Sequence, residues 1–177
     1  DKEAISETVI THEEDKKMEN AVISGIAFNR DEAKITITGV PDTPGVAFRI
    51  LGPIAKANID VDMIIQNSSN DGSTDFSFTV NRVDLDEATR VIETKVKSEI
   101  NALDISSDNQ ICKVSVVGIG MRSHVGVASQ MFEVLSNEGI NIKMISTSEI
   151  KISVVIDDKY MELAVRSLHD AFGLEKK

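Results

Sequence analysis

The sequence predicts an α+β fold in which one small unit occurs twice, and three observations support this prediction. The segment Ala33–Val40 (AKITITGV) recurs about 80 residues later as Cys112–Ile119 (CKVSVVGI). Each segment is followed by a polar loop, a Gly-Val-Ala tripeptide and an amphipathic run. The strand-like and helix-like patterns beyond them also come in the same order. Such self-similarity indicates two copies of one domain, and paired small domains usually bind something between them.

The chain leads into the first copy through strand-like segments. Residues 1–20 are charged and lack sustained apolar periodicity, so we expect a linker or tail there. Ala21–Phe28 (AVISGIAF) is apolar and compatible with an edge strand, and Asn29–Glu32 is expected to form a polar turn. Beyond this turn, Ile35 and Ile37 alternate with threonines, which predicts a strand with one buried face.

A helix is predicted to follow. Asp42-Thr43-Pro44 is a helix-start signal, in which a capping side chain precedes a proline at the first helical position. Apolar residues then recur at helical spacing, at Val46, Ile50, Ile54 and Ala57. Pro53 cannot donate to the carbonyl of the residue four positions earlier, so we expect a kink around Gly52–Pro53.

The remaining elements complete a β-α-β-β-α-β order. Two strands are predicted at Asn58–Asn67 and Phe76–Val80, joined by a hairpin loop at Ser68–Ser73 in which Asp71-Gly72 supplies the turn. An amphipathic helix at Leu85–Ile100 and a short strand at Leu103–Ile105 follow. This order is ferredoxin-like: two helices on one face of a four-stranded antiparallel sheet.

The second copy is predicted to be closed by a strand from the N-terminal segment. After its last helix, at Tyr160–Phe172, only five residues remain, too few for a fourth strand. Ala21–Phe28 has no place in the first copy, which already has four strands. We therefore expect it to cross over as the edge strand of the second copy. The predicted domains are residues 33–107, inserted within a domain made of residues 21–32 and 108–177.

Composition excludes several classes of function. A net charge of −10 argues against binding nucleic acid, because a phosphate backbone requires a Lys/Arg surface. No segment resembles a membrane span or a signal peptide. The single Cys112 fits a cytoplasmic protein without disulfides. The histidines are isolated and no phosphate-binding or nucleophile motif occurs, so we expect no metal, no cofactor and no catalytic residue.

Four segments resemble the regulatory region of aspartokinase, the paired ACT domains that follow its kinase domain. They are Lys34–Gly45 (KITITGVPDTPG), Val61–Asn67 (VDMIIQN), Cys112–Gly126 (CKVSVVGIGMRSHVG) and Ile145–Ser153 (ISTSEIKIS). The resemblance covers about Glu13 to Phe172, nearly the whole chain. It implies either an excised regulatory region or a separately translated small subunit, with the kinase catalytic domain or large subunit as partner. The implied function is feedback inhibition of aspartate kinase by threonine, lysine or both.

The chemistry of the first helix start agrees with an amino-acid effector. A helix N-terminus offers free amides and partial positive charge, which suit a carboxylate. Asp42 could pair with the ammonium group, and the amide of Gln66 could hold a small polar side chain such as the threonine hydroxyl. The residues expected at this site are Asp42, Thr43, Pro44, Gly45, Val46, Ala47, Gln66 and Asn67.

The second copy offers its own helix start at Ser123–Ser129, beside Ser146–Ile150. Glu149 could receive a cationic side chain, so lysine is a reasonable effector there. The residues expected at this site are Ser123, His124, Val125, Ala128, Ser129, Ser146, Thr147, Ser148, Glu149 and Ile150. In the family, ACT copies from two chains pack side by side, which implies a homodimer. It also implies that the backbone of Asp60, Val61, Asp62, Ile142 and Lys143 forms edge contacts.

Other interpretations of these residues stay open. Asp42 and Thr43 are expected as helix caps in any protein, and Gly45 and Gly126 could simply fit the turn from strand to helix. Gly45-Val46-Ala47-Phe48-Arg49 also matches the loop of acylphosphatases, which share the β-α-β-β-α-β order. However, Pro44 replaces their glutamine, and the second copy lacks the Phe-Arg pair. A free-standing ACT regulator of another target is a third possibility.

Overall fold

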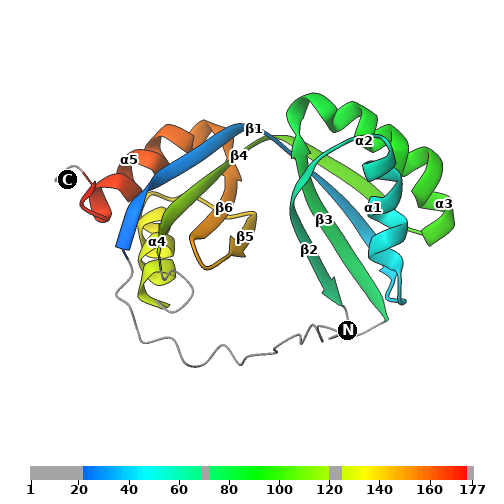
Figure 1. Ribbon diagram of the computed structural model, residues 1–177, viewed down its shortest axis with the longest axis horizontal. Coiled ribbons are helices and arrows are strands. Elements are labelled where there is room, and N and C mark those ends of the chain that lie inside the picture. Colours follow the sequence, from blue (N-terminus) through cyan, green and yellow to red (C-terminus); the bar gives the residue numbers. More distant parts are fainter. Residues whose placement is uncertain (1–21, 69–71, 120–124, 175–177) are drawn as a thin grey trace, which may run out of the picture.

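The structure is a computed structural model that describes residues 22–68, 72–119 and 125–174, so the predicted tail at residues 1–20 lies outside the described residues. One continuous sheet has two halves, the sheets of the two copies, which face each other and are each covered by helices on the outer side (Figure 1). We call the half with α1, α2 and α3 the first copy, and the half with α4 and α5 the second copy. The predicted α+β fold, antiparallel sheets with helices on one face, is confirmed.

Two long strands run through both halves. β1 (Val22–Pro41) has 20 residues and β4 (Asp104–Ile119) has 16. They form the centre of a six-stranded sheet in the order β2-β3-β1-β4-β6-β5. The outer strands are β2 (Val61–Ser68), β3 (Ser73–Asn81), β5 (Met144–Thr147) and β6 (Lys151–Asp157).

Two predictions about these long strands are wrong. Asn29–Glu32 is not a turn, because β1 continues through it with an irregular register. The polar side chain that suggested a turn instead stabilises this bulge, since Asn29 Oδ1 accepts a hydrogen bond from the Asp31 amide at 3.0 Å. Leu103–Ile105 is not a separate short strand either, because β4 begins at Asp104 and continues to Ile119.

Each half of β1 belongs to a different copy. Residues 22–29 pair with residues 113–119 of β4, while residues 32–38 pair with residues 104–111. The sheet of the first copy therefore has the order β4-β1-β3-β2, and that of the second copy β1-β4-β6-β5. On this pairing we propose that residues 33–107 form one domain, and residues 21–32 with 108–177 the other.

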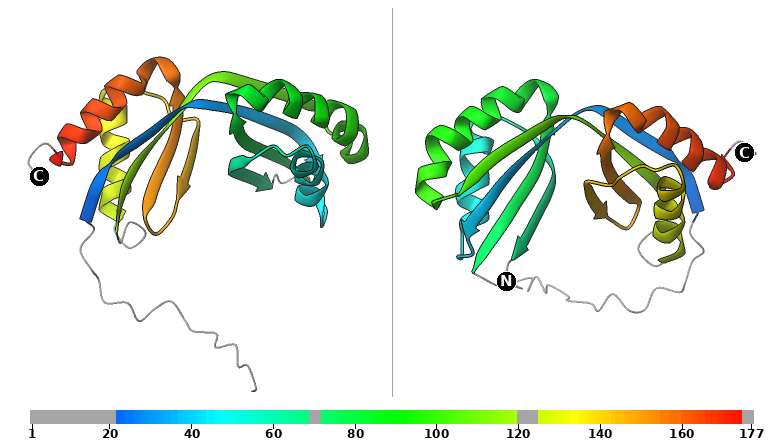
Figure 2. Two further views of the ribbon diagram at one scale, coloured as in Figure 1. Left: turned by 45° about the horizontal axis from the view of Figure 1, so that its top comes forward. Right: turned by 180° about the vertical axis from the view of Figure 1, so that it is seen from behind.

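The helices cover the outer faces of the sheets (Figure 2). In the first copy α1 spans Val46–Lys56, and one helical run comprises α2 (Leu85–Val91), the π-helical η3 (Ile92–Val96) and α3 (Lys97–Ile100). This run confirms the extent of the predicted second helix. The second copy has α4 (Val125–Asn137) and α5 (Met161–Ala171). Short 3-10 turns precede α2 and α5, η2 at Arg82–Asp84 and η5 at Asp158–Tyr160.

The π-helical segment has a cause in the sequence. Ile92, Val96 and Ile100 recur every four residues and are all buried in the first core. In an ordinary α-helix each step of four residues advances by about 40°, so the three side chains would spread over about 80° of the core face. The wider π-helical turn at η3 keeps the three side chains in line.

Each copy has its own core, and a third cluster joins them. The inner faces of the two sheets meet at a small buried cluster of Met63, Ile111, Met144 and Val155. Cys112 is fully buried in the second core, and burial raises the pKa of its thiol to about 11, as expected for a packing residue. The copies are thus two hydrophobic bodies joined by shared strands and an apolar contact.

Candidate functional site

The first helix start differs from its prediction. α1 begins at Val46, two residues later than expected, and no side chain caps it. Thr43 lies in a turn instead, since its carbonyl accepts from the Val46 amide at 3.2 Å and its hydroxyl from the Arg49 guanidinium at 2.7 Å. The interpretation of Asp42 and Thr43 as helix caps is therefore wrong. Pro44 precedes the N-cap rather than occupying the first helical position.

Gly45 is the N-cap residue and explains this shift. Its φ of 87° lies in the left-handed region, which other residues adopt only with strain. A Cβ added to Gly45 would meet no atom within 4 Å, so the constraint is the backbone conformation and not the space around it. This geometry turns the chain sharply out of β1 and leaves the first amides of α1 without a capping side chain.

Polar residues of β2 lie at the same end of the sheet as this helix start. Pro41, at the end of β1, pairs with Ser73, while Asn67 and Ser68 pair with Asp75 and Thr74. Gln66 lies opposite Phe76, so its side chain belongs to the face that the helices cover. Asp42, Gln66 and Asn67 are all exposed. Among the described residues, the carboxylate of Asp42 has no hydrogen-bond or ion-pair partner.

The Asp60–Asp62 segment lies at the opposite end of β2. Asp62 forms an ion pair with Lys113 of β4, whose ammonium group is also 3.0 Å from the buried carboxylate of Glu32. Burial lowers the pKa of Lys113, but the hydrogen bonds to Asp62 and Glu32 outweigh this effect and raise it. Within one chain these residues join the two copies, and they do not approach either helix start.

The second helix start is described in part. Ser123 and His124 lie outside the described residues, and α4 begins at Val125. Ala128 is half-buried against the second core, while Ser129 is exposed. Gly126 lies inside the helix and, unlike Gly45, has no positive φ. The two glycines therefore have different roles, and only Gly45 is required by a left-handed turn.

Ser146–Ile150 comprises the last two residues of β5 and the turn that connects it to β6. The amide of Ser148 donates to the Lys151 carbonyl at 2.8 Å, which closes a tight turn, and Glu149 at its tip is exposed. The amide of Gly118 donates to the Ile150 carbonyl at 2.8 Å, so this turn lies beside the end of β4. Thr147 pairs with Ile152 and Ser146 with Ser153, which places these two side chains on opposite faces of the sheet.

Ile142 and Lys143 precede the edge strand β5. Ile142 packs against the second core, and the Lys143 amide donates to the Val155 carbonyl at 2.8 Å. The ammonium group of Lys143 contacts Asp108 at 2.6 Å and Asp157 at 2.5 Å. The hydrogen bonds that this ammonium group donates to the two carboxylates raise the pKa of Lys143 more than burial lowers it. Lys143 therefore links the second copy to Asp108, in the part of β4 that pairs with residues 32–38 of β1.

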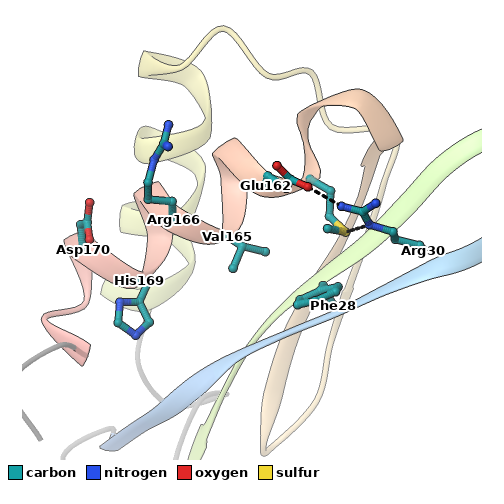
Figure 3. A pocket seen from close by; sticks show the side chains of 8 residues that line it. Phe28, Arg30, Glu162, Val165, Arg166, His169 and Asp170 are labelled. Atoms are coloured by element: carbon teal, nitrogen blue, oxygen red, sulfur yellow. Dashed lines mark hydrogen bonds and ion pairs between the residues drawn. The ribbon is translucent and has the colours of Figure 1, made fainter.

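Two cavities lie away from both helix starts. One, of about 420 Å³, is a groove between α5 and β1, lined by Phe28 and Val165 among others (Figure 3). The other, of about 390 Å³, lies beside Lys113, and its lining includes five acidic residues. Within the described ranges, no three His, Cys, Asp or Glu residues are placed to hold a metal ion. The helices described are too short or too polar to cross a membrane.

Sequence reasoning missed the residues that join the copies. Glu32, Arg82, Asp108 and Lys113 are single charged residues within strands or turns, and nothing in their local pattern distinguishes them from a solvated surface. The available signal was the alignment of the two copies, which places Arg82 and Asp158 at equivalent positions. Glu32 is 3% exposed, so a polar residue predicted in a turn proved to be buried.

Comparison with known families identifies both copies. Residues 34–95 and residues 114–172 each match a model described as ACT domain. The first match includes α1, both strands β2 and β3 and α2, and ends within η3 before α3, whereas the second includes β5, β6, α4 and α5.

Comparison with individual proteins indicates a more specific relationship. The chain is 64% identical over 168 residues to an aspartate kinase of Pseudomonas fluorescens, covering 95% of this chain, and 45% identical over 172 residues to an aspartokinase of Helicobacter pylori, covering 96%. It spans only 40% and 42% of the length of these relatives.

Two solved structures are covered almost completely by this chain. One, of aspartokinase alpha and beta subunits, is 57% identical with a TM-score of 0.80, and the match covers 86% of this chain and 99% of that one. The other is the ligand-free regulatory subunit of aspartate kinase from Thermus thermophilus. It is 39% identical with a TM-score of 0.80, and the match covers 85% of this chain and 98% of that one.

Proposed function

The chain belongs to the aspartokinase family, as a regulatory region with two ACT domains, and from this premise we propose that it binds end-product amino acids at its two helix starts. Threonine, lysine or both are the proposed effectors. Binding would inhibit an aspartate kinase, which makes 4-phosphoaspartate from aspartate and ATP. The kinase catalytic domain or large subunit is the proposed partner, in the cytoplasm.

One contrast among the helices carries this proposal. α2 and α5 have acidic residues in their first turn, Asp86 and Glu87 in one and Glu162 in the other. α1 and α4 have none, and α1 has no capping side chain either. The partial positive charge of these two N-termini is therefore not offset from within the first turn, which suits the carboxylate of an amino acid.

The surroundings of α1 can supply the remaining contacts. The exposed Asp42 carboxylate lies at the end of β1 and is suited to an ammonium group, since it has no partner among the described residues. Gln66 lies on the helix-covered face of the edge strand and offers an amide to a side-chain hydroxyl. Together, Asp42 and Gln66 favour a small polar amino acid. Threonine is therefore the proposed effector of the first copy.

The second copy has a different set of groups near α4. Thr147 lies on the helix-covered face, and Glu149 is exposed at the tip of the turn beside the end of β4. A carboxylate at this position suits a ligand that carries a second positive charge. We therefore propose lysine as the effector of the second copy, with Ser123 and His124 of the preceding segment as further contacts.

The sites are completed by a second chain in this proposal. β2 and β5 are the edge strands of the sheet, so one side of each backbone is available for pairing. In a homodimer the segments Asp60–Asp62 and Ile142–Lys143 would face the helix starts of the partner. An effector bound there would favour one arrangement of the ACT domains and thereby the inactive state of the kinase.

Calorimetric titration tests the effectors. The chain is titrated with threonine, lysine, methionine and isoleucine, and we expect threonine and lysine to bind. Asp42→Ala or Gln66→Ala should weaken threonine binding at least tenfold and leave lysine binding and the melting temperature unchanged. Asp86→Ala, which removes another exposed carboxylate of the first copy, is the matched control and should change neither threonine binding nor lysine binding. No heat from any of the four amino acids at millimolar concentration would contradict the proposal.

A further inference from the structure

The ladder between β1 and β4 has a two-fold symmetry that matches the sequence repeat. Glu32 pairs directly with Ile111, and these two residues are also equivalent positions of the two copies. The pairs from Gly25 with Val117 to Asn29 with Lys113 each have an image on the other side of this point. Asn29 with Lys113 corresponds to Lys34 with Asp108, and Ile26 with Val116 corresponds to Ile37 with Ile105. A pseudo-two-fold axis therefore passes between Glu32 and Ile111.

The strands farther from the axis obey the same correspondence. Ile35 pairs with Phe78 in the first copy, and the equivalent Val114 pairs with Val154 in the second. Met63 and Met144 are also equivalent, and both are 5% exposed within the one cluster that joins the sheets. The two copies thus face each other as the subunits of a symmetric dimer would, although they belong to one chain.

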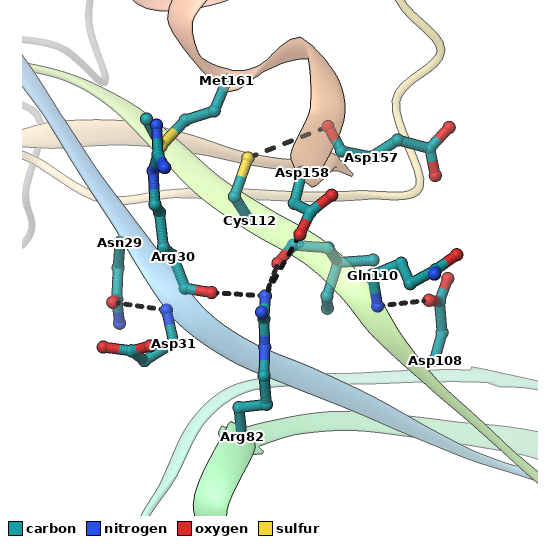
Figure 4. A network of polar contacts seen from close by, with 11 residues as sticks. Asn29, Arg30, Asp31, Arg82, Asp108, Gln110, Cys112, Asp157, Asp158 and Met161 are labelled. Carbon is teal, nitrogen blue, oxygen red and sulfur yellow. Dashed lines mark hydrogen bonds and ion pairs between the residues drawn. The ribbon is translucent and has the colours of Figure 1, made fainter.

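Arg82 and Asp158 meet across this axis. They are the first residues of the equivalent turns η2 and η5, and their charged groups are 3.6 Å apart (Figure 4). The Arg82 guanidinium also donates to the carbonyls of Arg30 at 2.6 Å and Ile111 at 3.0 Å. It therefore holds both long strands at the point where they cross from one copy to the other.

Charged residues beside the axis form ion pairs that the two-fold symmetry does not repeat. Lys113 contacts Glu32 and Asp62, and its two-fold image would place Lys34 against Ile111 and Lys143. Lys143 instead contacts Asp108 and Asp157, whose equivalents in the first copy are Asn29 and Asn81. Apart from the equivalent Lys34 and Lys113, the shared positions beside the axis are apolar, whereas the acidic partners have diverged.

We propose that this junction is a charge-selective interface that pairs unlike ACT copies, with Arg82 and Asp158 as its specificity-determining residues. A pairing of two first copies would place arginine against arginine and buried glutamate against glutamate at the axis. A pairing of two second copies would place aspartate against aspartate. Such contacts between like charges are unfavourable, most of all where the groups are shielded from water. The partner that fits the first copy at this face is the second copy.

A double-mutant cycle tests the axis pair. Arg82→Asp and Asp158→Arg should each lower the melting temperature by about 3 °C or more, because each places like charges together. The double exchange should recover at least half of the summed loss. Recovery will be incomplete, since Arg82 also donates to two carbonyls. The proposal would be overturned if the double variant lost as much melting temperature as the two single variants together.

Exchanging a second pair of charges tests whether direct contact between the two groups, rather than overall charge balance, determines the recovery. Asp62 and Lys143 are equivalent but do not contact each other, so exchanging them with Asp62→Lys and Lys143→Asp should lower the melting temperature further than either single change. Recovery in this variant would contradict the proposed geometry. Glu87→Arg with Arg90→Glu, an exposed pair on α2, is the control and should change the melting temperature little.

Milder substitutions keep the proposal testable if the charge-reversed variants do not fold. Arg82→Gln and Asp158→Asn remove the two charges without creating a repulsion. Their cycle should show a favourable coupling, seen as a double variant that loses less than the sum of the two single losses. Strict additivity of the two losses would overturn the assignment of Arg82 and Asp158.

Discussion

The two copies share the pairing register of their strands but differ at their helix starts and at their junction. Ala33 and Val80 pair in the first copy as Cys112 and Ile156 do in the second. At the helix starts, however, Gly45 is a left-handed N-cap, whereas Gly126 lies within α4. Duplication therefore preserved the positions that make the core. Divergence is concentrated at the helix starts, where we propose that a ligand binds, and at the junction between the copies.

The largest effect is expected from removing the strand that the N-terminal segment lends to the second copy. A chain beginning at Ala33 lacks residues 22–29, which pair with residues 113–119. The edge of the second sheet and the Ile23 and Ile26 side chains packed on its core would be lost. We expect the second copy to lose cooperative unfolding, as measured by circular dichroism during heating. A chain beginning at Ala21 is the control. Equal stability of the two truncated chains would refute the proposed domain division.

The next largest effect is expected from a buried pair of hydroxyl groups that differs between the copies in its exposure. Ser115 and Ser153 are 4% and 2% exposed and 2.7 Å apart, whereas the equivalent Thr36 and Ser77, 3.0 Å apart, are half-buried. Ser153→Ala leaves the Ser115 hydroxyl unsatisfied and should cost about 1–3 kcal/mol. Ser77→Ala should cost less, because water can reach Thr36. Urea unfolding measures both, and the double change of Ser115 and Ser153 to alanine should recover most of the loss.

The two glycines should respond to alanine with opposite signs. Gly45→Ala forces a side chain into the left-handed region and should destabilise the protein by about 1–2 kcal/mol. Gly126→Ala lies in a helix with no atom near the new Cβ and should stabilise by up to about 1 kcal/mol. Thermal unfolding of both variants decides this, and equal destabilisation by both would show that α4 starts as α1 does.

The smallest effect concerns acid stability at the junction. Burial would raise the pKa of Asp108, but hydrogen bonds from Lys143 and the Gln110 amide lower it below its ordinary value of 3.8. A carboxylate with a lowered pKa stabilises the fold above its unfolded value, and this contribution disappears as the pH falls through the folded value. Asp108→Asn should therefore lower the melting temperature at neutral pH. It should also flatten the decline of the melting temperature below about pH 4.

The matched control for this acid prediction is Asp104→Asn, which changes an exposed carboxylate of the same strand. It should reproduce the acid profile of the unmodified chain. An Asp108→Asn profile parallel to that of the unmodified chain at all pH values would show that Asp108 contributes nothing to acid unfolding.

Local patterns predicted most of the elements. Alternating residues such as Ile35 and Ile37 predicted strands, and the spacing of Leu85, Ala88, Ile92 and Val96 predicted a helix whose apolar face is buried. The start of α1 could not be predicted, because Asp42-Thr43-Pro44 has the composition of a cap. The left-handed conformation of Gly45 moved the start to Val46. The turn expected at Asn29–Glu32 failed for a similar reason, since the pairing of β1 with β4 outweighs the local preference of polar residues.

By itself the sequence determined the duplication, the class of fold and the membership of the aspartokinase family, because each depends on residue spacing or similarity along the chain. The tertiary structure alone decided that β1 and β4 run unbroken through both copies and that Arg82 faces Asp158. The pairs of β1 with β4 join residues 66 to 97 positions apart, and Arg82 lies 76 positions from Asp158, so these contacts are properties of the folded chain. No local pattern specifies such partners, because many isolated charged residues have the same neighbours in sequence.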